Sequence, residues 1–248
     1  MPAVIVSGAS GTIGRAVVER LSAAGRTVIL VGRDAAKLAS LAECYAAPYV
    51  AVDYSSSQAV EEALAPLIAE QEGADGVVHC VGSLLLKPAH ATSDAEFRAT
   101  LETNLFTAFT MVRVAAKFLR AGGGSVVLFA SAAADVGIAN HEAIGAAKAG
   151  IVGLARSAAA TYAPDNLRFN VISPGLVRTE LTRRIWQHDA SAAASRELHA
   201  LGRFGEPEQI AALACWLLDP ANDWITGQVI GLDGGLSRVL PKRRPAGA

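Results

Sequence analysis

The chain has 248 residues, of which 52% are hydrophobic and 18% charged, and its formal net charge is −1. This length can bury a substantial core, and this composition excludes an intrinsically disordered chain. The near-neutral charge gives no overall reason to expect nucleic acid or an anionic membrane as a partner, and no apolar run is long enough to span a bilayer.

Short runs of apolar, β-branched residues alternate with longer helical patterns along the chain. Most of these runs are apolar almost throughout, which predicts strands covered by helices on both faces. Repeated strand–helix units of this kind specify a parallel sheet with right-handed crossovers. The predicted strands are 3–7, 27–31, 48–53, 76–81, 125–130, 167–173 and 228–233. The predicted helices are 13–24, 35–44, 57–72, 94–120, 140–163 and 207–219.

These elements predict an α/β fold: a single doubly wound domain of the Rossmann type over residues 1–248, with a seven-stranded parallel sheet and helices on both faces. Residues 178–203 are less regular and follow a strand end where ligands of such folds bind. We interpret them as a flap over the substrate, and a plain surface excursion is the alternative. The last residues, 238–248, are expected to form a frayed tail.

The cysteines and the N-terminal segment bear on the compartment. Cys44, Cys80 and Cys215 lie far apart without the paired spacing of metal ligands, so no metal site is predicted. They are expected to be buried free thiols in a reducing compartment. The segment MPAVIVSG reads as a strand, not as a basic region followed by a long apolar one, and a cytoplasmic location is therefore expected.

A glycine-rich stretch, SGASGTIG, follows the first predicted strand and opens the first helix. Its glycines allow a tight turn, close backbone approach to a pyrophosphate and close helix–strand packing. The spacing G-x-x-G-x-x-G is a weak signal alone, but its place at the first strand–helix turn predicts a dinucleotide site, with a purely structural turn as the alternative. The predicted contacts come from Gly8, Ser10, Gly11, Thr12, Ile13 and Gly14.

The end of the second predicted strand bears on the choice of cofactor. NAD-binding folds usually place Asp or Glu there, but this chain has Gly32 followed by Arg33. A guanidinium can pair with a 2′-phosphate, which favours NADP(H) over NAD(H); an ordinary surface charge is the alternative. Asp34 is expected to cap the next helix. Asp53, ending the third strand, is expected to bond the adenine amino group or to be an ordinary turn residue.

Taken together, these stretches resemble the short-chain dehydrogenase/reductase family from residue 3 to about 237. The matching features, in the family's order, are GASGTIG, Asp53, Asn104 in ETNLF, Ser131 in FASAAADVG, Lys148 and SPGLVRT at 173–179. LGRFGEPEQIA and ITGQVIGLDGG are most similar to the ketoacyl-carrier-protein reductase branch. The resemblance implies an oxidoreductase that uses a nicotinamide cofactor and a small-molecule carbonyl or alcohol.

The resemblance also implies roles for the matching residues. Ser131 would bond the substrate oxygen, Lys148 would hold the nicotinamide ribose, and Asn104 would kink its helix around a water that links Lys148 to solvent. The alternatives are a loop hydroxyl, a helix-face charge and a helix cap. Gly82 would permit close approach to the adenosine ribose. The nicotinamide would be framed by Pro174, Gly175, Val177 and Thr179.

One departure from the family pattern concerns proton transfer. Ile144, four residues before Lys148, stands where the family has a tyrosine, and isoleucine has no proton to give to a reduced carbonyl. His141, one helical turn earlier, is a candidate substitute acid, and a capping or solvated histidine is the alternative. A second route uses a water with Ser131 and Lys148. The third outcome is a catalytically silent NADP(H)-binding protein.

Two further features concern the sheet and the assembly. His79 to Gly82 replace the family's Asn-Asn-Ala-Gly, and the missing amides remove contacts that brace the sheet. A homotetramer is expected, with a dimer as the next expectation. The resemblance to tetrameric members of the family lies in the GLDGG strand, the long helices carrying Asn104 and Lys148, and the small residues of helix 140–163. Packing within one chain is the alternative role of these small residues. Leu84–Leu86, Ile185 and Trp186 suggest an apolar substrate cleft, and the substrate's identity is not predicted.

Overall fold

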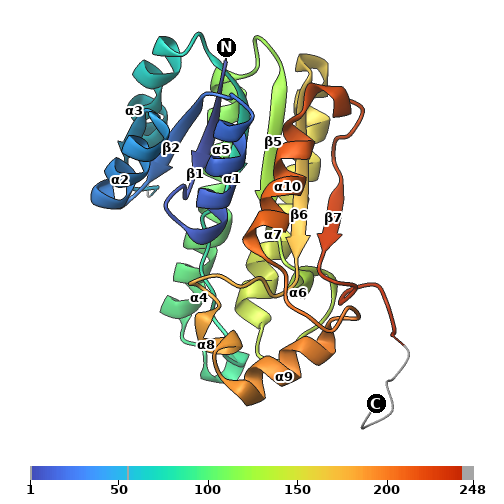
Figure 1. Ribbon diagram of the computed structural model, residues 1–248. Coiled ribbons are helices and arrows are strands. Elements are labelled where there is room, and N and C mark those ends of the chain that lie inside the picture. The colour runs from blue at the N-terminus through green and yellow to red at the C-terminus, as the bar shows by residue number, and fades with distance from the viewer. Residues whose placement is uncertain (1, 55, 242–248) are drawn as a thin grey trace.

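The computed structural model describes residues 2–54 and 56–241. Within these ranges seven strands form one parallel sheet, as predicted. The order of the strands is β3-β2-β1-β4-β5-β6-β7 (Figure 1). The strands are β1 (Ala3–Ser7), β2 (Val28–Gly32), β3 (Tyr49–Ala51), β4 (Ala74–His79), β5 (Gly124–Phe129), β6 (Leu167–Pro174) and β7 (Val229–Leu232). The expected tail falls largely outside the description, because residues 242–248 are not part of it.

Helices connect the strands and cover both faces of the sheet (Figure 1). They are α1 (Thr12–Ala23), α2 (Ala35–Tyr45), α3 (Ser57–Glu70), α4 (Asp94–Leu101), α5 (Thr107–Phe118), α6 (Ala132–Asp135), α7 (Glu142–Tyr162), α8 (Arg183–Trp186), α9 (Asp189–Leu198) and α10 (Pro207–Leu218). A π-helical segment, η2 (Glu102–Phe106), joins α4 to α5. Short 3-10 turns occupy Ala89–Ala91, Ala163–Asp165 and Pro220–Asn222.

Alternate residues of the buried strands point to two separate cores. In β1, Ile5 packs in a cluster with residues of α3, α5 and α7, such as Leu64 and Ile151. Val4 belongs to the other cluster, with residues of α1, α2 and α10 such as Val17. Because both faces of a strand are buried, the strands need apolar residues at consecutive positions, which explains the continuous apolar runs in the sequence.

All strands run in the same direction, so their carboxyl ends meet at one edge of the sheet. Figure 1 shows α4, α8 and α9 lying beyond this edge, while α1, α5, α7 and α10 run alongside the strands. The loops that follow β1, β2, β4, β5 and β6 therefore share one end of the molecule. This is the end at which open α/β sheets bind their ligands.

Three expectations about local structure were wrong. Residues 94–120 are not one helix, because η2 inserts a π-helical turn between α4 and α5. Residues 178–203 are more regular than expected, since the alanines, arginine and glutamate of α9 are good helix formers that present a single buried residue, Ala192. Cys44 is exposed on α2, whereas Cys80 and Cys215 are half-buried; all three are free thiols.

No helix in residues 2–54 and 56–241 is long and apolar enough to cross a membrane. The same described residues contain no group of three or more His, Cys, Asp or Glu side chains arranged to hold a metal ion.

Candidate active site

The glycine-rich loop makes a tight turn between β1 and α1. Gly8 has φ +72°, and its N–H donates to the carbonyl of Val31 (2.8 Å). A Cβ on Gly14 would lie 2.3 Å from the Gly8 carbonyl oxygen, so only glycine fits where helix and turn touch. Gly11 precedes α1 without a side-chain cap among the described residues. The first backbone N–H groups of α1 are thus available to an anion.

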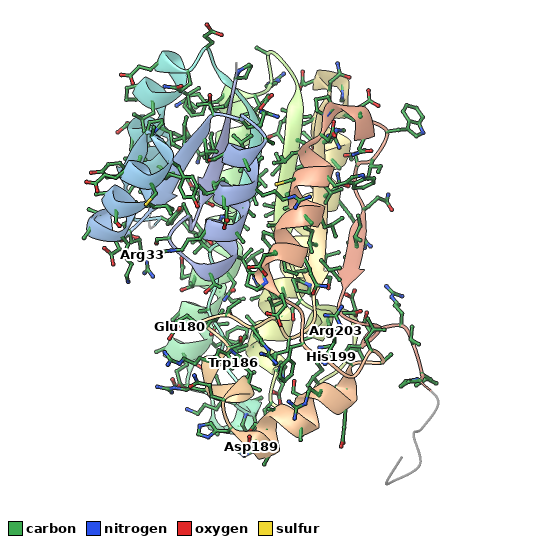
Figure 2. The ribbon with its side chains drawn as sticks, in the orientation of Figure 1. Arg33, Glu180, Trp186, Asp189, His199 and Arg203 are labelled. Carbon is green, nitrogen blue, oxygen red and sulfur yellow. The ribbon has the colours of Figure 1, made fainter. Side chains whose placement is uncertain are left out.

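Thr12 connects this loop to the segment after β6. Its hydroxyl oxygen accepts a hydrogen bond from the backbone N–H of Glu180 (3.2 Å). The Glu180 carboxylate in turn accepts from Arg183 (2.9 Å). Figure 2 shows Glu180 at the end of the molecule where α8 and α9 lie. The start of the expected flap therefore rests directly on the glycine-rich loop.

The residues after β2 and β3 are exposed. Arg33 follows Gly32, and its guanidinium forms no hydrogen bond or ion pair with the described residues; Figure 2 shows it on the surface beside α1 and α2. Asp34 accepts from the backbone N–H of Lys37 (3.1 Å), which confirms it as the cap of α2. Asp53 is exposed just beyond β3. An exposed guanidinium can reach a phosphate, whereas Asp34 is already engaged.

Asn104 is fully buried in the middle of η2. Its Nδ2 donates to the carbonyl of Thr100 and to the hydroxyl of Ser83, both at 2.9 Å, and its Oδ1 accepts from the Ser83 N–H (3.2 Å). The π-helical turn agrees with the expected distortion of the helix at this residue. The amide holds the loop after β4 against η2.

Gly82, Asn104 and Lys148 are brought together by three different elements. A Cβ on Gly82 would lie 3.1 Å from Asn104 Oδ1 and 3.5 Å from Lys148 Nζ. Lys148, on α7, is 8% exposed, and its ammonium donates to the Phe129 carbonyl (3.0 Å). Burial lowers the pKa of Lys148 to about 8. A close-packed cation therefore lies beneath the loop that follows β4.

Ser131 and Ile144 are separated along the chain by α6 and by the loop that joins α6 to α7. Ser131 follows β5, is half-buried and caps α6, where its hydroxyl accepts from the Ala133 N–H (3.2 Å). Ile144 lies in the first part of α7 and is only 2% exposed. His141 is the residue before α7, and its Nδ1 bonds to the carbonyl of Ala139 (2.8 Å).

The loop after β4 packs against the start of α7. The backbone N–H of Lys87 donates to the carbonyl of Asn140 (2.8 Å), and that of Ala89 donates to the carboxylate of Glu142 (3.3 Å). These bonds flank His141 on both sides. The loop that carries Leu84–Leu86 thus also fixes the backbone of the expected substitute acid.

The segment from Pro174 to Thr179 continues from β6 past the sheet edge. Thr179 is nearly buried; its hydroxyl bonds to that of Thr182 (3.0 Å), and its carbonyl accepts from the indole N–H of Trp186 (3.0 Å). Val177 is buried and pairs with Gly205. The expected nicotinamide frame is therefore held in place by α8.

His199 lies at the site, although the sequence did not indicate a role for it. Its Nδ1 bonds to the Ser195 carbonyl (2.7 Å), and its Nε2 accepts from the Leu176 N–H (3.0 Å). A Cβ on Gly175 would lie 2.6 Å from that Nε2, so glycine is needed there for steric reasons. Figure 2 shows His199 just beyond α9, near Arg203. Nothing in the sequence pattern links a lone histidine to a loop 23 residues earlier.

His79 was also misjudged. Its ring is 1% exposed and bonds to Ser7 Oγ (2.6 Å) and Thr107 Oγ1 (3.0 Å). The expectation that this segment loses its bracing contacts is therefore wrong at position 79. The available signal was a polar residue ending an otherwise apolar, buried strand, since such a residue must find partners.

Comparison with known proteins places this geometry in a family. A family model described as Enoyl-(Acyl carrier protein) reductase matches residues 8–237. A tropinone reductase homologue from Arabidopsis thaliana is 33% identical over 94% of this chain and 91% of that protein. A 2,5-dichloro-2,5-cyclohexadiene-1,4-diol dehydrogenase from Sphingobium indicum is 33% identical over 95% of this chain and 97% of that protein.

A solved structure gives the same assignment. The structure of a short-chain type dehydrogenase/reductase from Mycobacterium ulcerans superimposes with a TM-score of 0.91 and 31% identity, over 95% of this chain and 90% of that one. The similarity covers the glycine-rich loop, the sheet and the segments beyond its carboxyl edge. The chain therefore belongs to the short-chain dehydrogenase/reductase family of oxidoreductases.

Proposed function

We propose that this protein is an NADP(H)-dependent oxidoreductase that transfers a hydride between the nicotinamide and a carbonyl or secondary alcohol, through a proton relay without tyrosine. The observation that carries the proposal is the convergence of Gly82, Asn104 and the buried Lys148 ammonium at the carboxyl edge of the sheet. Retention of the whole cluster supports chemistry at this site.

The residues around the glycine-rich loop fit a dinucleotide. The close contact of Gly14 with Gly8 lets the chain turn tightly, and the uncapped start of α1 offers N–H donors to the pyrophosphate. In this proposal Ser10, Gly11, Thr12 and Ile13 complete that cradle, Asp53 holds the adenine and Gly82 lies under the adenosine ribose. Lys148 holds the nicotinamide ribose, and Pro174, Gly175, Val177 and Thr179 frame the nicotinamide.

Arg33 supports NADP(H) as the preferred cofactor. It is exposed directly after β2, where its guanidinium can pair with a 2′-phosphate. Family membership does not choose between the cofactors, since a relative from Listeria innocua, 31% identical over 93% of this chain and 92% of that protein, is named an NAD-dependent glycerol dehydrogenase. The preference therefore rests on Arg33 and the absence of an acid at position 32.

Proton transfer is assigned to His141, with Ser131 and Lys148. When bound, the reduced nicotinamide supplies the hydride. The Ser131 hydroxyl bonds the substrate oxygen, and the Lys148 ammonium stabilises the negative charge that develops there. His141 keeps Nδ1 on the Ala139 carbonyl, so in the imidazolium form Nε2 carries the proton that can be donated, directly or through water.

The second candidate function is a catalytically silent NADP(H)-binding protein that acts as a sensor or assembly subunit. The specific observation in its favour is Ile144, which is 2% exposed and fills the tyrosine's place with a side chain that has no proton. A purified protein that binds NADPH but reduces no carbonyl would favour this candidate. The two candidates share the cofactor site and differ only in the chemistry.

We further propose that the chain is one domain acting as a homotetramer, with a dimer as the alternative. Phe97 on α4 and Phe109 on α5 support an association surface, since both are large apolar side chains about 40% exposed. Residues 178–203 act as the substrate flap, resting on the glycine-rich loop through Thr12 and Glu180. In this proposal Ile185 and Trp186 of the flap and Leu84–Leu86 of the loop after β4 form the apolar surroundings of the substrate.

The experiment that tests the proposed function is a panel of aldehydes, ketones and oxoacyl thioesters with NADPH, followed by loss of absorbance of the reduced nicotinamide. We expect oxidation of NADPH that depends on one class of carbonyl and falls when Ser131→Ala is introduced. NADPH binding without oxidation across the panel would replace the proposal with the silent-binder alternative.

A further inference from the structure

The ring of His79 bridges two elements of the cofactor site. His79 is the last residue of β4 and pairs in register with Ser7, the last residue of β1. Its Nδ1 lies 2.6 Å from Ser7 Oγ, and its Nε2 lies 3.0 Å from Thr107 Oγ1, at the start of α5. The ring and the Ser7 side chain are completely or almost completely buried, so neither bond is shared with solvent.

The direction of each hydrogen bond follows from the partners. The Thr107 hydroxyl donates to the carbonyl of Thr103 (2.7 Å), so it must accept from Nε2–H of His79. The imidazole is then the neutral Nε2–H tautomer, and its bare Nδ1 accepts from the Ser7 hydroxyl. Burial, with a smaller effect from the Lys148 charge, lowers the pKa of His79 to about 3, in agreement with a neutral ring.

Each end of this chain of bonds is attached to a functional segment. Ser7 is followed directly by Gly8, whose φ of +72° begins the glycine-rich turn. At the other end, Thr103 lies within η2, next to Asn104. Asn104 accepts from the backbone N–H of Ser83 and so holds the loop after β4. Three polar side chains thus link the glycine-rich loop to the turn that carries Asn104.

We propose that His79 is a positioning residue that sets the glycine-rich loop and the π-helical turn at a fixed spacing, so that a dinucleotide held by the loop meets Asn104 and Lys148 in register. The effect on the dinucleotide rests on the proposed function. The link that His79 makes between the glycine-rich loop and the π-helical turn does not depend on it. Without the tyrosine, proton transfer relies on His141, Ser131 and Lys148. The rate then depends strongly on how accurately the cofactor and the substrate oxygen are placed relative to these groups.

The two arms of the ring can be separated by substitution. In His79→Asn the amide oxygen takes the place of Nδ1 and keeps the bond to Ser7, but the side chain is too short to reach Thr107. In His79→Gln the terminal amide reaches Thr107 and the acceptor facing Ser7 is lost. His79→Leu removes both bonds at similar volume, and it serves as the uncoupled background.

The test is a double-mutant cycle of Ser7→Ala and Thr107→Val, read by NADPH affinity and by amide hydrogen exchange at Ser83. In the protein that retains His79, the combined effect of the two substitutions on the Kd for NADPH should differ by at least about threefold from the product of their separate effects. In His79→Leu the two effects on the Kd should simply multiply. Ser7→Ala should speed exchange at Ser83 in the His79 protein and not in His79→Leu. Additivity in both backgrounds, with unchanged exchange, would overturn the proposal.

Two further measurements separate a failure of the His79 proposal from a failure of the proposed function. Nitrogen-15 NMR of the histidine rings should show His79 as the neutral Nε2–H tautomer from pH 5 to pH 8 at 25 °C, whereas an Nδ1–H tautomer or a charged ring would contradict the bond directions on which the proposal stands. If the wild type binds neither NADPH nor NADH, the proposed function fails, and the exchange at Ser83 alone then decides whether His79 couples the two segments.

Discussion

The ammonium of Lys148, on α7, donates a hydrogen bond of 3.0 Å to the carbonyl of Phe129, at the end of β5. The bond ties the long helix to the middle of the sheet and places the charge beneath Gly82. Burial lowers the pKa of this lysine to about 8, close enough to neutral pH for its charge to depend on conditions.

The first prediction follows from this pKa. At pH 7 the Lys148 side chain is mainly charged, and it loses its proton as the pH rises through about 8. Carbonyl reduction should therefore fall above pH 8, because a cation no longer stabilises the developing oxyanion. The measurement is kcat/KM for reduction from pH 6 to pH 10. The comparison is made in the His141→Ala background, where the histidine cannot contribute to the profile: there Lys148→Arg, which keeps its charge over this range, should lack the descending limb, and a flat profile for His141→Ala alone would exclude Lys148 from this role.

The second prediction concerns the substitute acid. His141→Ala should lower the rate of carbonyl reduction by about 10²–10⁴-fold, because it removes the proton donor and leaves the cofactor site intact. His90→Ala, which changes an exposed histidine on the loop after β4, is the matched control and should leave the rate unchanged. Steady-state rates with NADPH provide the comparison. An unaffected His141→Ala enzyme would direct the proton relay to water with Ser131 and Lys148.

Ile144→Tyr introduces the proton donor that the family resemblance assigns to this position, and it separates the two candidate functions. If the wild type is active, the added hydroxyl should change the rate modestly, since a relay already exists. If only Ile144→Tyr oxidises NADPH with a carbonyl, the natural protein is the silent binder. The hydroxyl must enter a place where Ile144 is now 2% exposed, so the melting temperature of the variant should be recorded beside its activity.

The third prediction tests the cradle at the start of α1. A Cβ added at Gly14 would lie 2.3 Å from the Gly8 carbonyl oxygen. This oxygen belongs to the backbone of the tight turn, so it cannot rotate away as a flexible side chain would. Gly14→Ala should cost about 1–3 kcal/mol of unfolding free energy and abolish NADPH binding. Gly122→Ala, where a Cβ would meet nothing within 4 Å apart from the adjoining residues of the chain, should stay within about 0.5 kcal/mol of the wild type. Equal effects at the two sites, measured by urea unfolding, would contradict the steric account.

Much of the fold could be predicted because continuous apolar runs such as AVIVS have one stable environment, a strand covered on both faces. The π-helical turn was expected only as a kink at Asn104 that the family resemblance implies, because ETNLF has ordinary helical composition and does not itself indicate an extra residue. Helix α9 was missed for a related reason: it buries only Ala192 and leaves no apolar stripe to detect.

Within the site, the sequence located residues that belong to contiguous motifs and missed those that act alone. Asn104 and Lys148 were expected to act together, and the structure places both beside Gly82, which was expected only at the adenosine ribose. His79 and His199 were not expected as partners of Ser7, Thr107 or Leu176, because the sheet topology and the fold of the flap bring these pairs together across long stretches of chain. A polar residue ending a buried strand signals only that partners exist.

The fourth prediction uses the neutral state of His79. Its pKa is lowered from 6.5 to about 3 by burial, so below pH 6.5 the unfolded chain takes up a proton that the folded chain refuses. Stability is therefore lost as the pH falls from 6.5 toward 3. Between pH 7 and pH 5 the wild type should lose about 2 kcal/mol more unfolding free energy than His79→Gln, since the other histidines cancel in the comparison. Parallel losses in urea titrations at the two pH values would show that His79 does not titrate in this way.

The fifth prediction concerns cofactor preference. Arg33→Ala should weaken NADPH binding about tenfold and leave NADH binding unchanged, because only NADPH carries the 2′-phosphate. Lys37→Ala is the matched control, since Lys37 already pairs with Asp34 (3.0 Å) on the same helix start. Isothermal titration of the three proteins with both nucleotides gives the six affinities needed. A similar loss for NADH, or a loss in the control, would remove Arg33 as the specificity residue.

The central claim is tested most directly by titrating the wild-type protein with NADPH and NADH under identical conditions. We expect saturable binding of both nucleotides, with NADPH the tighter, and loss of binding in Gly14→Ala. Failure of both nucleotides to bind the wild type would contradict the claim that the glycine-rich loop, Arg33 and Lys148 form a nicotinamide dinucleotide site.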